Sequence, residues 1–90
     1  MQNLTYARNS RVVDRIVDSQ LFLLDDHSGR IHALDGAAAG IWNLLERPHS
    51  MSAMLEIFRA AFPHETPKNI RSILCKALNE LQRKRLVEVA

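Results

Sequence analysis

The chain has 90 residues, 47% of them hydrophobic, and a formal net charge of +2 at pH 7. This length and composition favour one small globular domain and argue against intrinsic disorder. No apolar run is long enough for a membrane span and no signal-peptide pattern opens the chain, while the mild positive charge does not by itself indicate nucleic acid. The single cysteine cannot form an internal disulfide, which fits a reducing compartment. We expect a cytoplasmic protein without a membrane segment.

Three short strands are predicted after a polar N-terminal stretch. We expect residues 1–10 to form a flexible N-terminal arm and residues 11–90 to form one domain. Arg11 to Val17 is β-branched with charges interspersed, which predicts a strand that partly meets solvent. Leu21 to Leu24 is a continuous apolar run, which predicts a strand buried on both faces. Ile31 to Leu34 is the third strand, and the short connections favour an antiparallel meander.

Small polar residues define the turn before the third strand and the helix after it. Asp25 to Gly29 predicts a tight turn, because Asp and Ser bond nearby backbone groups and Gly accepts positive φ. Asp35 is predicted to cap, through its carboxylate, a helix that begins at Gly36. The apolar residues of this helix recur at i, i+3, i+4 and i+7 and predict its buried face: Ala38, Ile41, Trp42 and Leu45.

Two further helices are predicted in the second half of the chain. Ser50 or Ser52 is expected to cap the second helix. Thr66 followed by Pro67 is a strong start signal for the third, since proline at the first helical position loses no hydrogen bond. This third helix carries the most regular apolar stripe in the chain and should end near Arg85.

The final residues, Leu86 to Val89, fit either a short strand or a tail packed on the core. The predicted order of elements is therefore a three-stranded antiparallel sheet followed by three helices. This is an α+β fold with a winged-helix-turn-helix-like layout.

The sequence contains no pattern typical of a catalytic, cofactor-binding or metal-binding site. The histidines lack the spacing of metal ligands: His27, His32, His49 and His64. Cys75 lies beside the apolar stripe of the third helix and is interpreted as a structural thiol. Asp25 and Asp26 are interpreted as turn residues rather than as an acid–base pair. We expect no enzymatic activity, no cofactor and no metal.

The first binding hypothesis is a winged-helix DNA-binding regulator of transcription. The third helix carries six basic residues against Glu80, and a basic helix could enter a major groove: Lys68, Arg71, Lys76, Arg83, Lys84 and Arg85. The predicted hairpin tip, however, carries Asp25 and Asp26, and a wing that contacts phosphate requires positive charge. Nucleic acid is therefore the less favoured partner.

The second binding hypothesis is capture of an extended peptide. In an antiparallel meander the strand over Ile31 to Leu34 lies at one edge, with backbone N–H and C=O groups free to pair with another chain. The third helix could form the other wall of a groove, and its positive charge would favour an acidic peptide.

The segment LLDDHSGRIHALDGAAAGIW, which ends at Trp42, resembles the PqqD-like family. These are the recognition elements for precursor peptides of ribosomally made, modified peptides. The shared pattern is an apolar strand, an acidic-Ser-Gly turn, a strand that ends in Leu34-Asp35, and a helix of small residues that reaches Ile41-Trp42. Further matches continue in register, and the resemblance covers residues 11–89.

The resemblance implies a winged-helix-like fold without catalytic activity of its own. It implies that the leader segment of a precursor peptide adds as a strand to the third strand, fills the cleft beside the third helix, and is presented to a modifying enzyme. On the third strand the implied contacts are Arg30, Ile31, His32, Ala33 and Leu34. On the third helix they are Ile70, Arg71, Ile73, Leu74 and Ala77, and about half of the whole set is expected to be core.

The implied partners are the precursor peptide and a modifying enzyme of the same pathway, such as a leader peptidase, a cyclase or a radical SAM enzyme. The chain departs from the family pattern at Asp35, which replaces Asn, and at Arg47-Pro48 and Arg85, which replace Asp-Gly and Gly. These departures favour a lasso-peptide or other modified-peptide pathway over a strict PQQ pathway. Either a monomer or a weak homodimer is compatible with the sequence.

Overall fold

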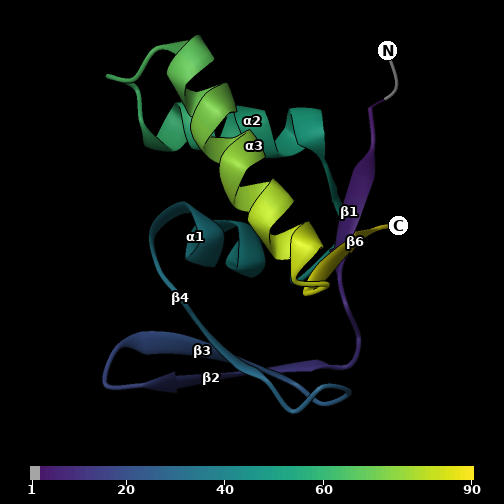
Figure 1. Cartoon of the computed structure of the whole chain (residues 1–90). Coiled ribbons are helices and arrows are strands. Elements are labelled where there is room, and N and C mark those ends of the chain that lie inside the picture. The colour runs from purple at the N-terminus through teal and green to yellow at the C-terminus, as the bar shows by residue number, and fades with distance from the viewer. Residues whose placement is uncertain (1–2) are drawn as a thin grey trace.

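The computed structural model describes residues 3–90. An antiparallel sheet forms one layer of the molecule, with strand order β2-β3-β4, and the helices lie over one of its faces (Figure 1). Its strands are β2 (Val12–Val17), β3 (Gln20–Asp25) and β4 (Ile31–Leu34). The helices are α1 (Gly36–Leu44), α2 (Met51–Ala61) and α3 (Pro67–Arg83). The predicted α+β fold with an antiparallel meander and three helices is confirmed.

The N-terminal residues form a second small sheet that the sequence did not predict. Strand β1 (Thr5–Arg8) pairs with β5 (His49–Ser50) on one side and with β6 (Val87–Val89) on the other. Tyr6 is only 6% exposed in this sheet. The prediction of a flexible arm is therefore wrong for Thr5–Arg8, because ladder hydrogen bonds and the burial of Tyr6 hold it. Residues 1–2 of that predicted arm lie outside the described residues.

One core fills the space between the helices and the β2-β3-β4 sheet. Leu21 and Leu23 on β3 are buried, whereas Leu24 is 39% exposed. The prediction that this strand is buried on both faces is wrong, because the helices cover only one face of the sheet (Figure 1). No helix within residues 3–90 is both long and apolar enough to cross a membrane.

The helix starts follow the sequence signals at two of three positions. The Ser50 hydroxyl accepts a hydrogen bond from the Ala53 N–H at 3.1 Å, and the Thr66 hydroxyl accepts one from the Asn69 N–H at 3.1 Å. Asp35 occupies the cap position of α1, but its side chain makes no cap hydrogen bond. The predicted carboxylate cap is therefore wrong, and the chain instead turns into α1 through Gly36, whose φ is +52°.

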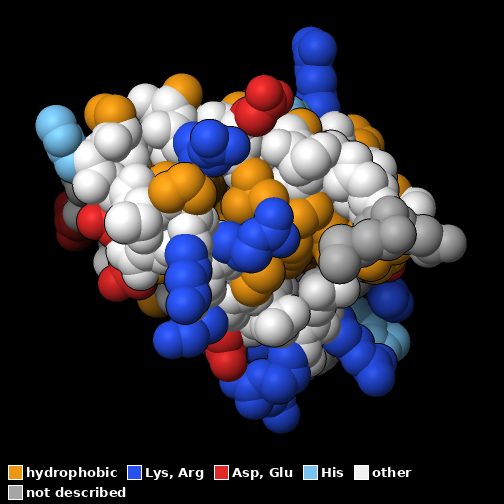
Figure 2. Space-filling view, turned by 90° about the horizontal axis from the view of Figure 1, so that it is seen from above, with side chains coloured by type: hydrophobic (Ala, Val, Ile, Leu, Met, Phe, Trp, Pro, Cys, Tyr) orange, Lys and Arg blue, Asp and Glu red, His pale blue; other side chains and the backbone are white. Residues whose placement is uncertain are grey.

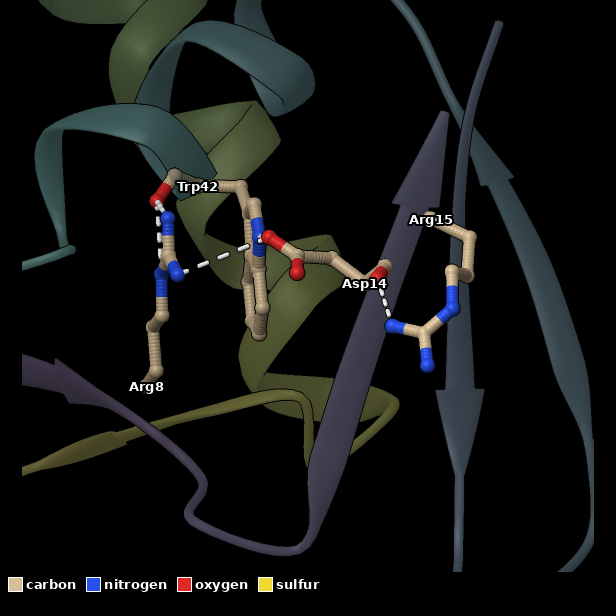
Figure 3. A network of polar contacts seen from close by, with 4 residues as sticks. All are labelled: Arg8, Asp14, Arg15 and Trp42. Atoms are coloured by element: carbon tan, nitrogen blue, oxygen red, sulfur yellow. Dashed lines mark hydrogen bonds and ion pairs between the residues drawn. The ribbon is translucent and has the colours of Figure 1, made fainter. Parts of the chain in front are cut away.

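A polar cluster of Arg8, Asp14 and Trp42, here called the Arg8 clamp, joins both sheets to α1 (Figure 3). The Arg8 guanidinium donates from Nε and Nη2 to the Trp42 carbonyl at 2.9 and 2.7 Å. It also lies 4.3 Å from the centre of the indole ring, within the range of a cation–π interaction. The indole Nε1 donates to Asp14 Oδ2 at 2.9 Å, so a residue from each of β1, β2 and α1 takes part.

The turn between β3 and β4 is held by Asp25. Its carboxylate accepts hydrogen bonds from the backbone N–H of His27 at 3.0 Å and of Ser28 at 3.5 Å. Its carbonyl accepts one from Gly29 at 2.7 Å, and Gly29 has a φ of +73°. The His27 N–H and, to a smaller extent, Ser28 lower the pKa of Asp25 below its ordinary value. These contacts fix the point at which β4 begins.

Arg8→Ala should destabilise the fold by about 2 kcal/mol, because it removes two charge-assisted hydrogen bonds and the cation–π contact. Arg8→Lys should recover less than half of this loss, since an ammonium cannot form the same two-pronged contact. Urea unfolding followed by the fluorescence of the single tryptophan measures both. The exposed Arg11 is the matched control, and equal losses from Arg8→Ala and Arg11→Ala would contradict the role of the clamp.

Asp25→Ala should cost stability at neutral pH and lose this effect in acid. The folded-state pKa of Asp25 is lowered, so its contribution is fully present above the unfolded pKa of about 3.9 and disappears as the pH falls through the lower folded value. The free energies of unfolding of Asp25→Ala and wild type, compared at pH 7 and in acid, test this. Thr66→Ala removes a neutral cap and should cost the same at each pH. If the difference in the free energy of unfolding between Asp25→Ala and wild type were the same at both pH values, the prediction would be contradicted.

Candidate functional site

Strand β4 has a free edge. It pairs with β3 alone in the part of the chain that the structure describes. The Asp25 N–H donates to the Arg30 carbonyl at 2.9 Å, which makes Asp25 and Arg30 a hydrogen-bonded pair at the start of the ladder. Bonded and non-bonded pairs alternate along an antiparallel ladder. The backbone N–H and C=O of Ile31 and Ala33 therefore point away from β3, toward the open edge.

The two faces of β4 differ. His32 and Leu34 pair with Leu23 and Leu21 and so face the helices; Leu34 is 5% exposed and His32 is half-buried. Ile31 and Ala33 lie on the opposite face, where Ile31 is 67% exposed. A strand added to this edge would place alternate side chains toward the helices and toward solvent.

The predicted contacts on α3 fall into two groups. Ile70 and Leu74 are 3% and 0% exposed, so in this structure they are core residues. Arg71 and Ile73 are exposed, and Ala77 is half-buried. Leu34 joins the core group on the side of β4, while Arg30 is exposed. Whether any of these residues contacts a peptide stays a prediction.

An apolar hollow, here called the helix hollow, lies among the three helices and has a volume of about 670 Å³. Gly36 and Ala37 from the start of α1 line it, so it begins two residues after β4 ends. Ile73, Ile57 and Phe62 are 40%, 39% and 53% exposed and line it as well. The full lining is Gly36, Ala37, Gly40, Leu44, Ile57, Phe58, Ala61, Phe62, Glu65, Ile70 and Ile73.

Gly40 lines the helix hollow opposite Phe58. A Cβ atom at Gly40 would lie 3.5 Å from the end of the Phe58 ring, so a larger side chain would project into this space. Ile70 and Ile73 on α3 were among the residues predicted from the sequence, whereas the lining residues of α1 and α2 were not. The run of small residues from Gly36 to Gly40 was the available signal.

Positive charge surrounds the exposed apolar residues of the helices. Figure 2, which looks onto the molecule from above, shows Lys and Arg side chains gathered around exposed hydrophobic ones. A shallow recess beside α2 and α3 is lined by Arg59, Lys68 and Arg71. Arg83 and Lys84 at the end of α3 form ion pairs with Glu80. Lys68 and Arg71 in the N-terminal half of α3 form no ion pair within residues 3–90 and are available to an acidic ligand.

Within residues 3–90, no three His, Cys, Asp or Glu side chains are placed to hold a metal ion. Cys75 is half-buried and free of any disulfide. Three neighbouring features are candidates for recognition of a peptide: the open edge of β4, the helix hollow and the basic surface of α2 and α3.

Comparison with solved structures supports the fold. The chain superimposes on the structure described as "TbiB1 in Complex with the TbiA(beta) Leader Peptide" with a TM-score of 0.79. The two chains share 24% sequence identity, and the match covers 91% of this chain and 94% of that chain. Comparison with curated proteins found no match.

A family model described as "Coenzyme PQQ synthesis protein D (PqqD)" matches residues 20–87. The matched segment begins at β3, includes the open edge of β4, and continues through all three helices to β6. It spans more than half of the chain and agrees with the resemblance found in the sequence. The chain therefore belongs to the PqqD family.

Proposed function

We propose that this protein is a non-catalytic peptide carrier. It captures the leader segment of a ribosomally made precursor peptide by strand addition to β4 and presents it to a modifying enzyme of the same pathway. The observation that carries the proposal is the open edge at Ile31 and Ala33, next to the helix hollow. Membership of the PqqD family supports it, as does the leader peptide in the TbiB1 complex.

Backbone pairing alone is too weak for tight binding. Ile31 and Ala33 offer four outward groups, and each hydrogen bond contributes a net of about 0.5–1.5 kcal/mol. Ordering the peptide costs several kcal/mol, whereas a micromolar Kd corresponds to about −8 kcal/mol. Burial of apolar side chains of the leader, each worth about 1.5–3 kcal/mol, must supply the difference, and two such anchors at the upper end of this range bring the total near that value.

The helix hollow is the place for such an anchor. Peptide residues opposite His32 and Leu34 face the helices, because side chains alternate along a strand. The hollow begins two residues beyond Leu34 and is lined almost entirely by apolar side chains. Lys68 and Arg71 at the nearby end of α3 favour a leader with acidic residues.

The departures at Arg47-Pro48 and Arg85 lie outside both β4 and the lining of the helix hollow. They favour a lasso-peptide or other modified-peptide pathway over PQQ synthesis itself, with a leader peptidase, a cyclase or a radical SAM enzyme as the partner. Sequencing of the genes beside that of this chain is expected to identify both the precursor and that enzyme. DNA binding is less well supported, because the hairpin tip between β3 and β4 exposes Asp26 beside Asp25 and would repel phosphate.

Ala33→Pro should weaken leader binding by at least about tenfold while the protein stays folded. Proline removes the outward N–H of residue 33, which does not serve the β3–β4 ladder. The matched control is Ile16→Pro. Ile16 lies on β2 and pairs with Leu21 on β3, and the same alternation points its N–H away from β3, at the opposite edge of the sheet. Titration of each variant with the synthetic leader of the neighbouring precursor gene gives the two affinities.

Full-strength binding by a folded Ala33→Pro variant would show that β4 is not the pairing edge. Loss of leader binding in Ile16→Pro but not in Ala33→Pro would show that the leader pairs with β2 instead. Circular dichroism of both variants establishes that the fold is retained.

Ile73→Ser should weaken leader binding by about 5- to 30-fold, which corresponds to about 1–2 kcal/mol of lost apolar burial. Ile73 is 40% exposed at the helix hollow, so the free protein should lose little stability. Val89→Ser on β6 is the control, because Val89 is similarly exposed at 47% but lies outside the hollow. Equal affinities for Ile73→Ser, Val89→Ser and wild type would exclude the hollow as the anchor site.

A further inference from the structure

The face of the β2-β3-β4 sheet that points away from the helices is unusually apolar. Cross-strand pairing places eight residues on it, here called the outer sheet face: Val13, Arg15, Val17, Gln20, Phe22, Leu24, Ile31 and Ala33. Six of the eight are apolar. Val13, Val17, Leu24 and Ile31 are exposed by 41%, 55%, 39% and 67%.

This pattern departs from what an antiparallel sheet with one solvated face normally shows. Such strands alternate between apolar residues toward the core and polar residues toward water. Here the uncovered side (Figure 1) has a continuous apolar row across all three strands, Val13–Leu24–Ile31. An exposed apolar patch of this kind is typical of a surface that another molecule covers.

Arg15 gives the outer sheet face a positive charge. It is the only charged residue among the eight positions, and it lies between Val13 and Val17 on β2. Its guanidinium donates to the backbone carbonyl of Asp14 at 2.8 Å (Figure 3). Within residues 3–90 it forms no ion pair, because the Asp14 carboxylate is engaged by Trp42 on the other side of the sheet. A carboxylate on the covering molecule is therefore the counter-charge that best matches Arg15 when water is displaced.

A second copy of this chain is a poor fit for the face. None of the eight positions carries a carboxylate. Two copies stacked through these positions would desolvate two arginines without a counter-charge, which is costly. A partner with an apolar surface and an acidic residue fits better.

The leader strand would enlarge this surface. Three strands of four to six residues, spaced about 4.8 Å apart and rising about 3.3 Å per residue, present only about 250 Å². A stable interface buries about 800 Å² on each partner. A peptide strand added to β4 extends the sheet, and its residues opposite Ile31 and Ala33 lie on the same outer face. The loaded carrier therefore offers a larger surface on this side of the sheet than the empty one.

We propose that the outer sheet face is the central part of the docking surface for the modifying enzyme, that an acidic residue of the enzyme pairs with Arg15, and that the bound leader strand forms part of the interface. The part concerning the leader rests on the proposed function; the Arg15 contact stands on the sheet alone. The enzyme should accordingly bind the loaded carrier more tightly than the empty carrier.

The test uses the enzyme encoded beside the gene of this chain, with and without the synthetic leader of the neighbouring precursor. Arg15→Glu should reduce enzyme affinity at least about tenfold, since it places two carboxylates together, and should leave leader affinity unchanged. Val17→Ser, which removes exposed apolar surface at the end of β2, should reduce enzyme affinity without any change of charge. Arg47→Glu is the control, because Arg47 is an exposed arginine in the loop after α1 and belongs to none of the proposed binding surfaces.

Unchanged enzyme affinity in both Arg15→Glu and Val17→Ser would overturn the docking proposal. Equal losses in Arg15→Glu and Arg47→Glu would also overturn it, because they would indicate a general charge effect. A wild-type dimer in sedimentation that Arg15→Glu stabilises or dissolves would assign the face to self-association instead. Failure of the leader to bind wild-type protein would reject the peptide-carrier function, while dependence of enzyme binding on Arg15 would still support the docking surface.

Discussion

The Arg8 clamp is the contact on which the arrangement of the molecule depends. The guanidinium of Arg8 binds the carbonyl of Trp42 and stacks on its ring, while the indole N–H binds Asp14. These three residues come from β1, β2 and α1, so one cluster connects the small N-terminal sheet, the meander and the first helix. Because α1 follows β4 with only Asp35 between them, holding Trp42 also holds β4 at the edge of its sheet.

This arrangement leaves three surfaces for other molecules, and each has a different physical character. The edge of β4 offers backbone hydrogen bonds at Ile31 and Ala33, the helix hollow offers apolar burial, and the outer sheet face combines an apolar row with the single charge of Arg15. Edge and hollow are adjacent, which suits one extended peptide with an apolar anchor. The outer face lies on the far side of the sheet, so a second partner could bind there while the peptide is in place.

Local signals in the sequence were sufficient for most of the fold. The turn at Asp25 to Gly29 and the caps at Ser50 and Thr66 depend on contacts within four residues, and such contacts can be inferred from neighbouring residue types. The β1 strand could not be inferred in this way, because it depends on pairing with residues 49–50 and 87–89. The Arg8 clamp and the helix hollow could not be predicted for the same reason, because each is formed by residues that are distant in the sequence. Asp35 differs from both. Its residue type favours capping, but its side chain makes no cap hydrogen bond, because the backbone at the next residue, Gly36, takes a positive φ.

Amide hydrogen exchange at β4, measured with and without the synthetic leader, tests strand addition most directly. In the free protein the N–H groups of His32 and Leu34 should be protected by the ladder with β3, whereas those of Ile31 and Ala33 should exchange quickly. Leader binding should slow exchange at Ile31 and Ala33 specifically. Protection that appears on β2, or only on the helices with Ile31 and Ala33 unchanged, would contradict the account.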